Sequence, residues 1–422
     1  MQSFIKVLSA ILFAGLFPIV AAAQKTDKLL SDLLRKNPEL FGPILQDPAK
    51  YDVQIIYTQI NRDPQNRPVF RSYYYRYDRK RYFYPASTVK FPAVLLSLEK
   101  INELKAKYPA LTPNTPMLTD SAYARQTAAD KDPSSASGLP SVAHYAKKIF
   151  LVSSNEAFNR LYEFIGQCDF NNRLQQKGYR DTRMLHRLSV SMTADQNRHT
   201  NPVRFVENGQ TIYAQPAQVC AESFTPDSSI RRGAGFMRND SLIRQPFDFT
   251  EKNAFALGDQ QEMLRAVMFP EAVPAKRRFN LTTDDYRFLY QYMSQLPRET
   301  TYPNYGADTS LHDSSGKFFM FGDNKGKIPQ NIRIFNKIGG AYGYLLDNAY
   351  IVDFDKGVEF MLSAVIYCNS DGIFNDDKYD YNTIGYPFLA NLGRVVYDYD
   401  VKRKRPERPD LRKFMVTYDK QQ

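Results

Sequence analysis

The chain changes from a strand pattern to a helix pattern around residue 87. From Phe70 to Tyr84, aromatic residues alternate with other side chains, which predicts a β-strand. After Ser87 the apolar residues recur at three- and four-residue intervals as far as Leu104, which predicts an amphipathic helix. We therefore expect Ser87 at the junction, in the first turn of that helix, near unpaired backbone N–H groups and the positive end of the helix dipole.

Further elements are predicted in the middle and near the end of the chain. Residues Ser141–Phe150 have the spacing of an amphipathic helix. Residues Ile332–Asn336, Asn348–Phe354 and Gly357–Cys368 have strand patterns, and a turn at Asp355-Lys356 would join the last two as an antiparallel hairpin.

The first residues have the pattern of a secretory signal peptide. Lys6 precedes an apolar run, and Ala21-Ala22-Ala23 supplies the small residues of a cleavage site. We expect a signal peptide over residues 1–23 and a mature periplasmic or secreted protein that begins near Gln24. No later stretch is apolar enough to predict an integral membrane segment after signal cleavage.

The net charge of +11 is spread along the chain, which does not favour a nucleic-acid partner. The one basic run, Lys402-Arg403-Lys404-Arg405, is expected to be a solvated tail. A basic exported protein could also be attracted to anionic polymers of the cell envelope.

Cysteines and histidines indicate neither a metal site nor a cofactor. The four histidines lack metal-ligand spacing, and no C-x-x-C, phosphate-binding or dinucleotide motif occurs. Three cysteines allow one disulfide at most, and the sequence leaves open whether Cys168 pairs with Cys220. Cys368 lies in an apolar run and is expected to be a buried small hydrophobic residue.

The first candidate for chemistry is the pair Ser87 and Lys90. A serine hydroxyl is a weak nucleophile until a base takes its proton, and a partly buried lysine one helical turn away can be that base. The S-x-x-K pattern also occurs at Ser3–Lys6, Ser97–Lys100 and Ser314–Lys317, and Ser87 could simply cap a helix.

Two later segments supply further candidates. Ser153 and Asn155 lie where one predicted helix ends and the next begins, so both could point into a cleft or cap the helices. Lys337 is followed by Gly339 and Gly340 late in a strand, where glycines allow the backbone to approach a ligand closely. Alternatively, Lys337 is only a charge on an edge strand.

Together, S-x-x-K, S-x-N and K-x-G occur in the order found in the penicillin-recognising serine hydrolases. From about Tyr51 to Asp400 the chain resembles the class A β-lactamase family. The resemblance implies an α+β fold in which an antiparallel five-stranded sheet is flanked by terminal helices, Asp27–Leu34 and Tyr386–Val396, with an inserted all-helical lobe. The sheet would contain strands near Tyr51–Asn61 and Phe70–Tyr84, together with the three late strands.

By the same resemblance, residues 24–422 form a single catalytic domain. Its α/β lobe covers about 24–86 and 310–422, and its helical lobe covers about 87–309. An insertion relative to the family covers about 194–249. It contains a predicted hairpin over Val203–Ala214, turned at Glu207-Asn208-Gly209.

The resemblance also implies roles for the candidate residues. Ser87 would be the nucleophile and Lys90 its base, Ser153 would relay a proton to the leaving nitrogen, and Lys337 would attract a substrate carboxylate. On the substrate-binding side, the resemblance implies that Asn155 binds the acyl side chain and that Gly339 and Gly340 line the site. The oxyanion would be held by the backbone N–H groups of Ser87 and Gly340.

Two departures from the family pattern affect the expected chemistry. Ile338 replaces the hydroxyl residue that binds a substrate carboxylate. The family carries a glutamate that activates the deacylating water in the loop after a Thr-Arg pair, whereas the loop after Thr182-Arg183 has no carboxylate from Met184 to Ala194. The candidate that could replace this base is Asp195, the first acid beyond the loop, if the insertion folds Asp195 or Glu207 back into the cleft.

Three functions therefore stay open for this protein, which we expect to be a monomer with a small-molecule or peptidoglycan-derived substrate or ligand. The first is an acyl-enzyme hydrolase that cleaves an amide, β-lactam or ester. The second is a D-Ala-D-Ala-type peptidase or esterase that β-lactams acylate without efficient hydrolysis. The third is a catalytically silent envelope-binding protein.

Overall fold

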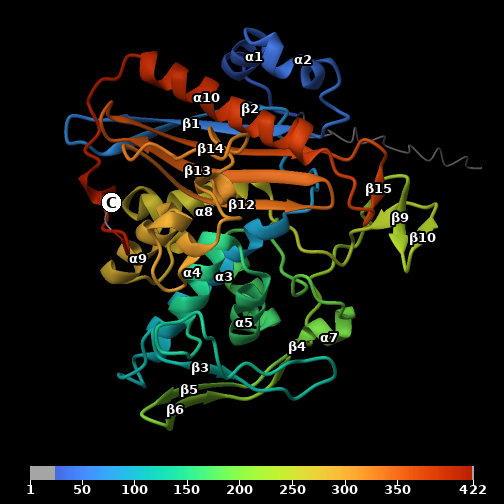
Figure 1. Cartoon of the computed structure of the whole chain (residues 1–422), viewed down its shortest axis with the longest axis vertical. Coiled ribbons are helices and arrows are strands. Elements are labelled where there is room, and N and C mark those ends of the chain that lie inside the picture. The colour runs from blue at the N-terminus through green and yellow to red at the C-terminus, as the bar shows by residue number, and fades with distance from the viewer. Residues whose placement is uncertain (1–23, 421–422) are drawn as a thin grey trace, which may run out of the picture.

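The computed structural model describes residues 24–420, so the predicted signal peptide lies outside the described residues. Its centre is a five-stranded antiparallel sheet, which confirms the predicted α+β class (Figure 1). Both ends of the chain contribute strands, in the spatial order β12-β13-β14-β1-β2. The strands are β1 (Gln54–Arg62), β2 (Pro68–Tyr75), β12 (Ile332–Ala341), β13 (Tyr344–Asp353) and β14 (Val358–Tyr367).

Terminal helices cover one face of the sheet (Figure 1). These are α1 (Lys28–Arg35), α2 (Pro38–Gln46) and α10 (Tyr386–Lys402), and their apolar faces share one buried core with the sheet. Pro43 is tolerated within α2, and Pro38 occupies the first turn, where its missing N–H costs no helical hydrogen bond.

Helices pack beneath the opposite face of the sheet, around a second and larger core. Helix α8 contacts β1, β13 and β14, and α9 contacts β12. Helices α3 and α5 pack against each other in the middle of this region, and most residues of both helices are buried. The bounds are α3 (Lys90–Leu104), α4 (Val142–Val152), α5 (Asn155–Ile165), α6 (Gln167–Gln176), α8 (Leu257–Met268) and α9 (Thr283–Ser294).

Three strands differ from the prediction by four residues or more, and one of them, β13, begins at Tyr344, four residues before the predicted start at Asn348. Strand β2 ends at Tyr75, so residues Phe83 and Tyr84 are buried in a separate aromatic cluster and not in the sheet. The prediction of a strand to Tyr84 was wrong because the aromatic residues after Tyr75 recur at intervals typical of a strand, although they lie in a loop and pack into a buried cluster. Strand β12 continues to Ala341, five residues beyond the predicted end at Asn336.

The inserted lobe is not all-helical, which corrects that prediction. It contains small sheets of two or three strands, and each strand has six residues or fewer. The predicted hairpin is confirmed as β5 (Val203–Glu207) and β6 (Gln210–Gln215). Strand β3 (Met117–Thr119) joins this hairpin. The other short elements are α7 (Ala194–Arg198), β4 (His199–Thr200), β7 (Gln218–Val219), β8 (Arg231–Arg232), β9 (Gly235–Arg238), β10 (Ser241–Ile243), β11 (Phe247–Asp248) and β15 (Ile373–Phe374).

The basic run near the C-terminus is not a solvated tail. Asp400 is fully buried and accepts hydrogen bonds from Tyr57 Oη at 2.6 Å and Arg403 Nε at 2.7 Å, and Arg405 also contacts it. A buried carboxylate needs paired donors, and the run supplies them. The prediction failed because the acid that pairs with these arginines precedes the run on α10.

Cys168 and Cys220 form a disulfide, which links α6 to the insertion. Cys368 is a free buried thiol, as predicted, and burial raises its pKa above the ordinary value. No helix within residues 24–420 is long and apolar enough to span a membrane.

Candidate active site

Ser87 and Lys90 lie together at the start of α3. A short 3₁₀ helix, Ala86–Val89, leads into α3 and places Lys90 Nζ 2.8 Å from Ser87 Oγ. Ala86 has a positive φ of 48°, which turns the chain sharply before Ser87. Lys90 has 0% of its surface exposed, and burial together with the charge of Lys337 holds its pKa well below the ordinary value of 10.5. Lys90 is therefore suited to act as a neutral base.

Ser153 and Asn155 reach the same lysine from the junction of α4 and α5. Ser153 adopts the left-handed conformation that ends α4, with φ 56°, and Ser154 caps α5. This corner brings Ser153 Oγ to 3.2 Å and Asn155 Oδ1 to 2.6 Å from Lys90 Nζ. The carbonyl of Ser153 also accepts a hydrogen bond from Lys90.

Lys337 approaches from the sheet. Its Nζ donates to Ser153 Oγ at 2.8 Å and to the carbonyl of Ile338 at 2.9 Å. Burial lowers the pKa of Lys337 to about 7, opposed by Asp347 and reinforced by Lys317. The structure thus joins Ser87, Lys90, Ser153 and Lys337 into one continuous chain of close contacts.

Gly339 is required by the closeness of β12 to the 3₁₀ helix. A Cβ atom at Gly339 would lie 2.9 Å from Pro85 O and 3.1 Å from Ser87 N. The strand therefore passes directly beside the nucleophile, and Gly340 follows it into the cleft. Ile338, one residue earlier, packs instead toward the core beneath the terminal helices.

A buried polar network supports Lys337 from behind. Lys317 Nζ donates to Asn336 Oδ1 at 2.7 Å, and Asn336 Nδ2 donates to Asp347 Oδ1 at 2.8 Å. Burial lowers the pKa of Lys317 and raises the pKa of Asp347, and each charge partly offsets the shift of the other. Lys317 belongs to one of the other S-x-x-K patterns, so this pattern has a structural role that the sequence did not indicate.

The remaining S-x-x-K patterns are separate from the candidate site. Lys100 Nζ donates to the carbonyls of Phe164 and Ile165, which satisfies the end of α5. Ser97 is buried in α3. The pattern Ser3–Lys6 lies outside the described residues.

The loop after Thr182-Arg183 is held by amide and ionic contacts. Arg187 Nε forms a buried ion pair with Glu163 at 2.8 Å. Asn159 accepts from the Leu188 N–H at 2.7 Å and donates to its carbonyl at 3.0 Å. At the exposed end of the loop, Asn155 Nδ2 donates to Ser189 Oγ at 2.7 Å. The loop is firmly positioned, yet it brings no carboxylate to the cleft.

Asp195 is not placed as a base for Ser87. Its carboxylate accepts a hydrogen bond from Tyr123 Oη at 2.9 Å, and 64% of its side chain is exposed. It does not line the cleft that contains Ser87. The suggestion drawn from its position in the sequence therefore fails, because α7 directs it away from the nucleophile.

The cleft beside Ser87 has a volume of about 720 Å³. Sequence reasoning missed several residues that line it, namely Tyr84, His186, Lys252, Tyr342 and Asp377. The ring of Tyr84 meets Tyr342 edge-on at 4.9 Å and stacks on His186 at 6.3 Å. The abundance of Tyr and Phe was the only sequence signal for this aromatic wall.

His186 and Asp377 differ in their suitability for acid–base work. Burial lowers the pKa of His186 to about 4, and its Nδ1 lies 2.5 Å from the Arg187 carbonyl, so the ring is neutral with Nδ1–H as donor. Asp377 is the single carboxylate among the described residues that line the cleft, and it is exposed to solvent.

Comparison with known proteins gives a family match over part of the chain. Residues 50–221 match the model of the beta-lactamase enzyme family, which confirms the predicted resemblance. This segment includes Ser87, Lys90, Ser153 and Asn155, whereas Lys337 lies beyond it. A comparison with curated proteins found no match.

Several solved structures of β-lactamases align with most of the chain at low identity. One from Desulfarculus baarsii has 13% identity and a TM-score of 0.45, covering 87% of this chain and 97% of its own. One from Clostridium kluyveri, a class A enzyme, has 14% identity and a TM-score of 0.44, covering 86% and 98%. One from Burkholderia phymatum has 11% identity and a TM-score of 0.46, covering 88% and 100%.

Proposed function

We propose that this protein is an exported, monomeric serine hydrolase that is acylated at Ser87 by an amide, β-lactam or ester substrate. The observation that carries the proposal is the 2.8 Å separation of Lys90 Nζ from Ser87 Oγ, with Lys90 fully buried beside Lys337. A neutral amine at this distance can take the hydroxyl proton as the oxygen attacks. The match to the beta-lactamase enzyme family supports the same reaction type.

Acylation follows from the contacts around Lys90. Ser87 Oγ attacks the substrate carbonyl carbon, and its proton passes to Lys90 Nζ. The backbone N–H groups of Ser87 and Gly340, both at the cleft, would stabilise the oxyanion, and each such donor is typically worth about 3 kcal/mol in the transition state.

The leaving nitrogen would be protonated through Ser153. Its hydroxyl lies 3.2 Å from Lys90 Nζ and 2.8 Å from Lys337 Nζ, so it can pass a proton on and be resupplied by either lysine. When the carbon–nitrogen bond breaks, the leaving amine departs neutral and Ser87 keeps the acyl group as an ester.

Deacylation is expected to be slow. The loop over residues 184–194 brings no carboxylate to the cleft, and Asp195 is directed elsewhere. General-base assistance is typically worth about 10²–10⁴-fold in rate, so its absence should leave an acyl-enzyme that persists. This favours a peptidase or esterase that penicillin inhibits, over an efficient β-lactamase.

The test is intact-protein mass after incubation with a fluorescent penicillin. We expect a stable adduct of one penicillin on the wild type and none on Ser87→Ala. Ser97→Ala is the matched control, because Ser97 is a buried S-x-x-K serine on α3, the helix that follows Ser87, and its hydroxyl has no hydrogen-bond partner among the described residues. Labelling of Ser87→Ala, or no labelling of the wild type by any serine-reactive probe, would contradict the proposal and favour a silent binding protein.

A further inference from the structure

A second cavity adjoins the cleft of Ser87 and is built largely by the insertion. It has a volume of about 960 Å³, and we call it the insertion pocket. The insertion pocket and the cleft share part of one wall, formed by His186, Val190, Met192, Phe247 and Lys252. The cleft and the insertion pocket are therefore direct neighbours, and a ligand that reached past these residues would enter the insertion pocket.

The insertion pocket adjoins the acyl side of the cleft. Asn155, to which the family resemblance assigns the acyl side chain, donates to Ser189 Oγ, and the next residue, Val190, belongs to the shared wall. The part of a substrate that stays on Ser87 is thus the part that would enter it.

The walls of the insertion pocket are fixed by covalent and polar contacts. The disulfide between Cys168 and Cys220 holds the segment that leads to Glu222. Arg198 Nη2 donates to the carbonyls of Ala221 at 3.2 Å and Glu222 at 2.8 Å, which secures the same segment. The pocket is therefore a built feature of the fold and does not depend on loose loop ends.

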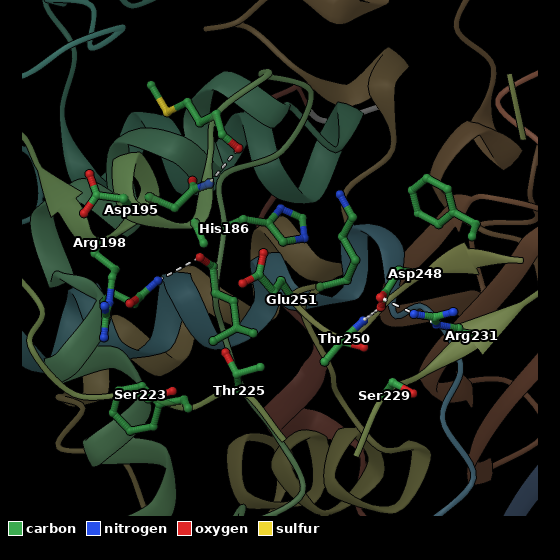
Figure 2. A pocket seen from close by; sticks show the side chains of 18 of the residues that line it. His186, Asp195, Arg198, Ser223, Thr225, Ser229, Arg231, Asp248, Thr250 and Glu251 are labelled. Carbon is green, nitrogen blue, oxygen red and sulfur yellow. Dashed lines mark hydrogen bonds and ion pairs between the residues drawn. The ribbon is translucent and has the colours of Figure 1, made fainter. Parts of the chain in front are cut away.

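Charges of both signs face the insertion pocket. Figure 2 shows Glu251 near its middle, with Asp195 and Arg198 on one side and Asp248 and Arg231 on the other. Arg231 Nε and Asp248 are 3.9 Å apart, a loose and exposed pair. Glu251 is exposed and forms no ion pair with any residue in the part of the chain that the structure describes.

Lys252 supplies a cation at the shared wall. Its Nζ lies 5.7 Å from the centre of the Phe247 ring, and no carboxylate of residues 24–420 lies within ion-pair distance of it. Partial burial makes such a cation costly unless a ligand anion neutralises it. Glu251 and Lys252 both line the insertion pocket, which therefore presents a carboxylate and an ammonium of the protein to a ligand.

We propose that the insertion pocket is an acyl-side subsite for a zwitterionic peptide segment, with Lys252 binding its carboxylate and Glu251 its ammonium group. This deepens the proposed function and rests on it for the chemistry at Ser87. Opposite charges held together fit a ligand that carries both signs, whereas a purely anionic or purely cationic ligand would leave one protein charge unpaired. The volume is that of a pocket for a ligand of dipeptide size or larger.

Binding is tested without catalysis. The probe is the dipeptide Glu-Lys with blocked α-amine and α-carboxyl groups, which keeps one side-chain carboxylate and one side-chain ammonium. Titration calorimetry on the Ser87→Ala protein should show binding, and adding Glu251→Gln or Lys252→Met should weaken it roughly tenfold, the size of one charge-assisted hydrogen bond. Lys107→Met, a change at an exposed lysine remote from the cavity, should leave it unchanged.

Catalysis is tested with two thioesters that share a leaving group and differ in the acyl part, one neutral and one carrying the same zwitterionic dipeptide. The wild type should prefer the zwitterionic thioester in kcat/KM, and both pocket variants should lose that preference. Absence of dipeptide binding, or equal kcat/KM for the two thioesters, would overturn the subsite. Dipeptide binding without any acylation of Ser87 would instead contradict the proposed function alone.

Discussion

Gly339→Ala should slow acylation while leaving most of the fold intact. The added Cβ would lie 2.9 Å from Pro85 O, 3.1 Å from Ser87 N and 3.2 Å from the Cβ of Ala86. These neighbours are two backbone atoms and a methyl group, so no side-chain rotation relieves the contact. Optimal contacts between such atoms are roughly 3.5 Å, and β12 and the 3₁₀ helix must therefore separate by about half an ångström.

The cost can be estimated for stability and for rate. Overpacking of this kind typically costs about 1–3 kcal/mol in unfolding free energy. Misplacement by about 1 Å can cost about 100-fold in rate, so half that displacement predicts a loss of roughly tenfold in acylation of Ser87.

The assay is the rate of fluorescent penicillin labelling, followed with the unfolding free energy from urea denaturation. The control is Gly42→Ala in α2, where a Cβ meets nothing within 4 Å; it should label normally and be at least as stable as the wild type. Wild-type labelling by a folded Gly339→Ala protein would refute the claim that β12 sets the position of Ser87.

Three further outcomes follow from the site and the insertion. Because burial and Lys337 lower the pKa of Lys90, the acylation rate should rise with pH and level off at a pH well below 10.5. Lys90→Arg stays protonated and should not be labelled by penicillin at any pH, so labelling of this variant would exclude Lys90 as the base. The penicillin adduct, followed by mass spectrometry, should last minutes or longer, because a general base typically speeds such a step by roughly 10²–10⁴-fold and none is placed for deacylation. Asp195→Asn and Asp377→Asn should change the lifetime of the adduct by no more than about twofold, and a much longer lifetime in either variant would identify that residue as the base. Removing the disulfide with Cys168→Ala and Cys220→Ala together should lower the unfolding free energy by about 4 kcal/mol, as expected for a sequence separation of 52 residues. A loss below about 1 kcal/mol in urea denaturation would show that other contacts hold the insertion in place without the disulfide.

The parts of the site that are local in sequence could be predicted. Ser87 and Lys90 are one turn apart, and Ser153 and Asn155 flank one helix junction, so helix geometry alone brings each pair together. The order of the three motifs resembles that of a known family, and this resemblance predicted that Lys337 belongs to the same site.

The parts that depend on distant packing could not be predicted. Nothing near Asn336 in sequence indicates that its side chain links Lys317 to Asp347 behind Lys337. The strand prediction to Tyr84 failed for a related reason, because its aromatic periodicity reflects packing against Phe249 of the insertion, and not pairing in a sheet. The insertion pocket could not be predicted either, because it is formed by segments that are distant in sequence and whose relative positions depend on the whole fold.

The strand order has a consequence for how the chain reaches this structure. Strand β1 pairs with β14, so that Gln54 lies opposite Val365, and the whole helical region is enclosed between them. Such a pairing closes a very long loop, which makes folding slow and leaves β1 and β2 without their central neighbour until the last strands arrive. A chain translocated from its N-terminus would therefore keep an unpaired hairpin edge exposed for most of its passage, and we expect this hairpin to be the segment that most needs protection from aggregation.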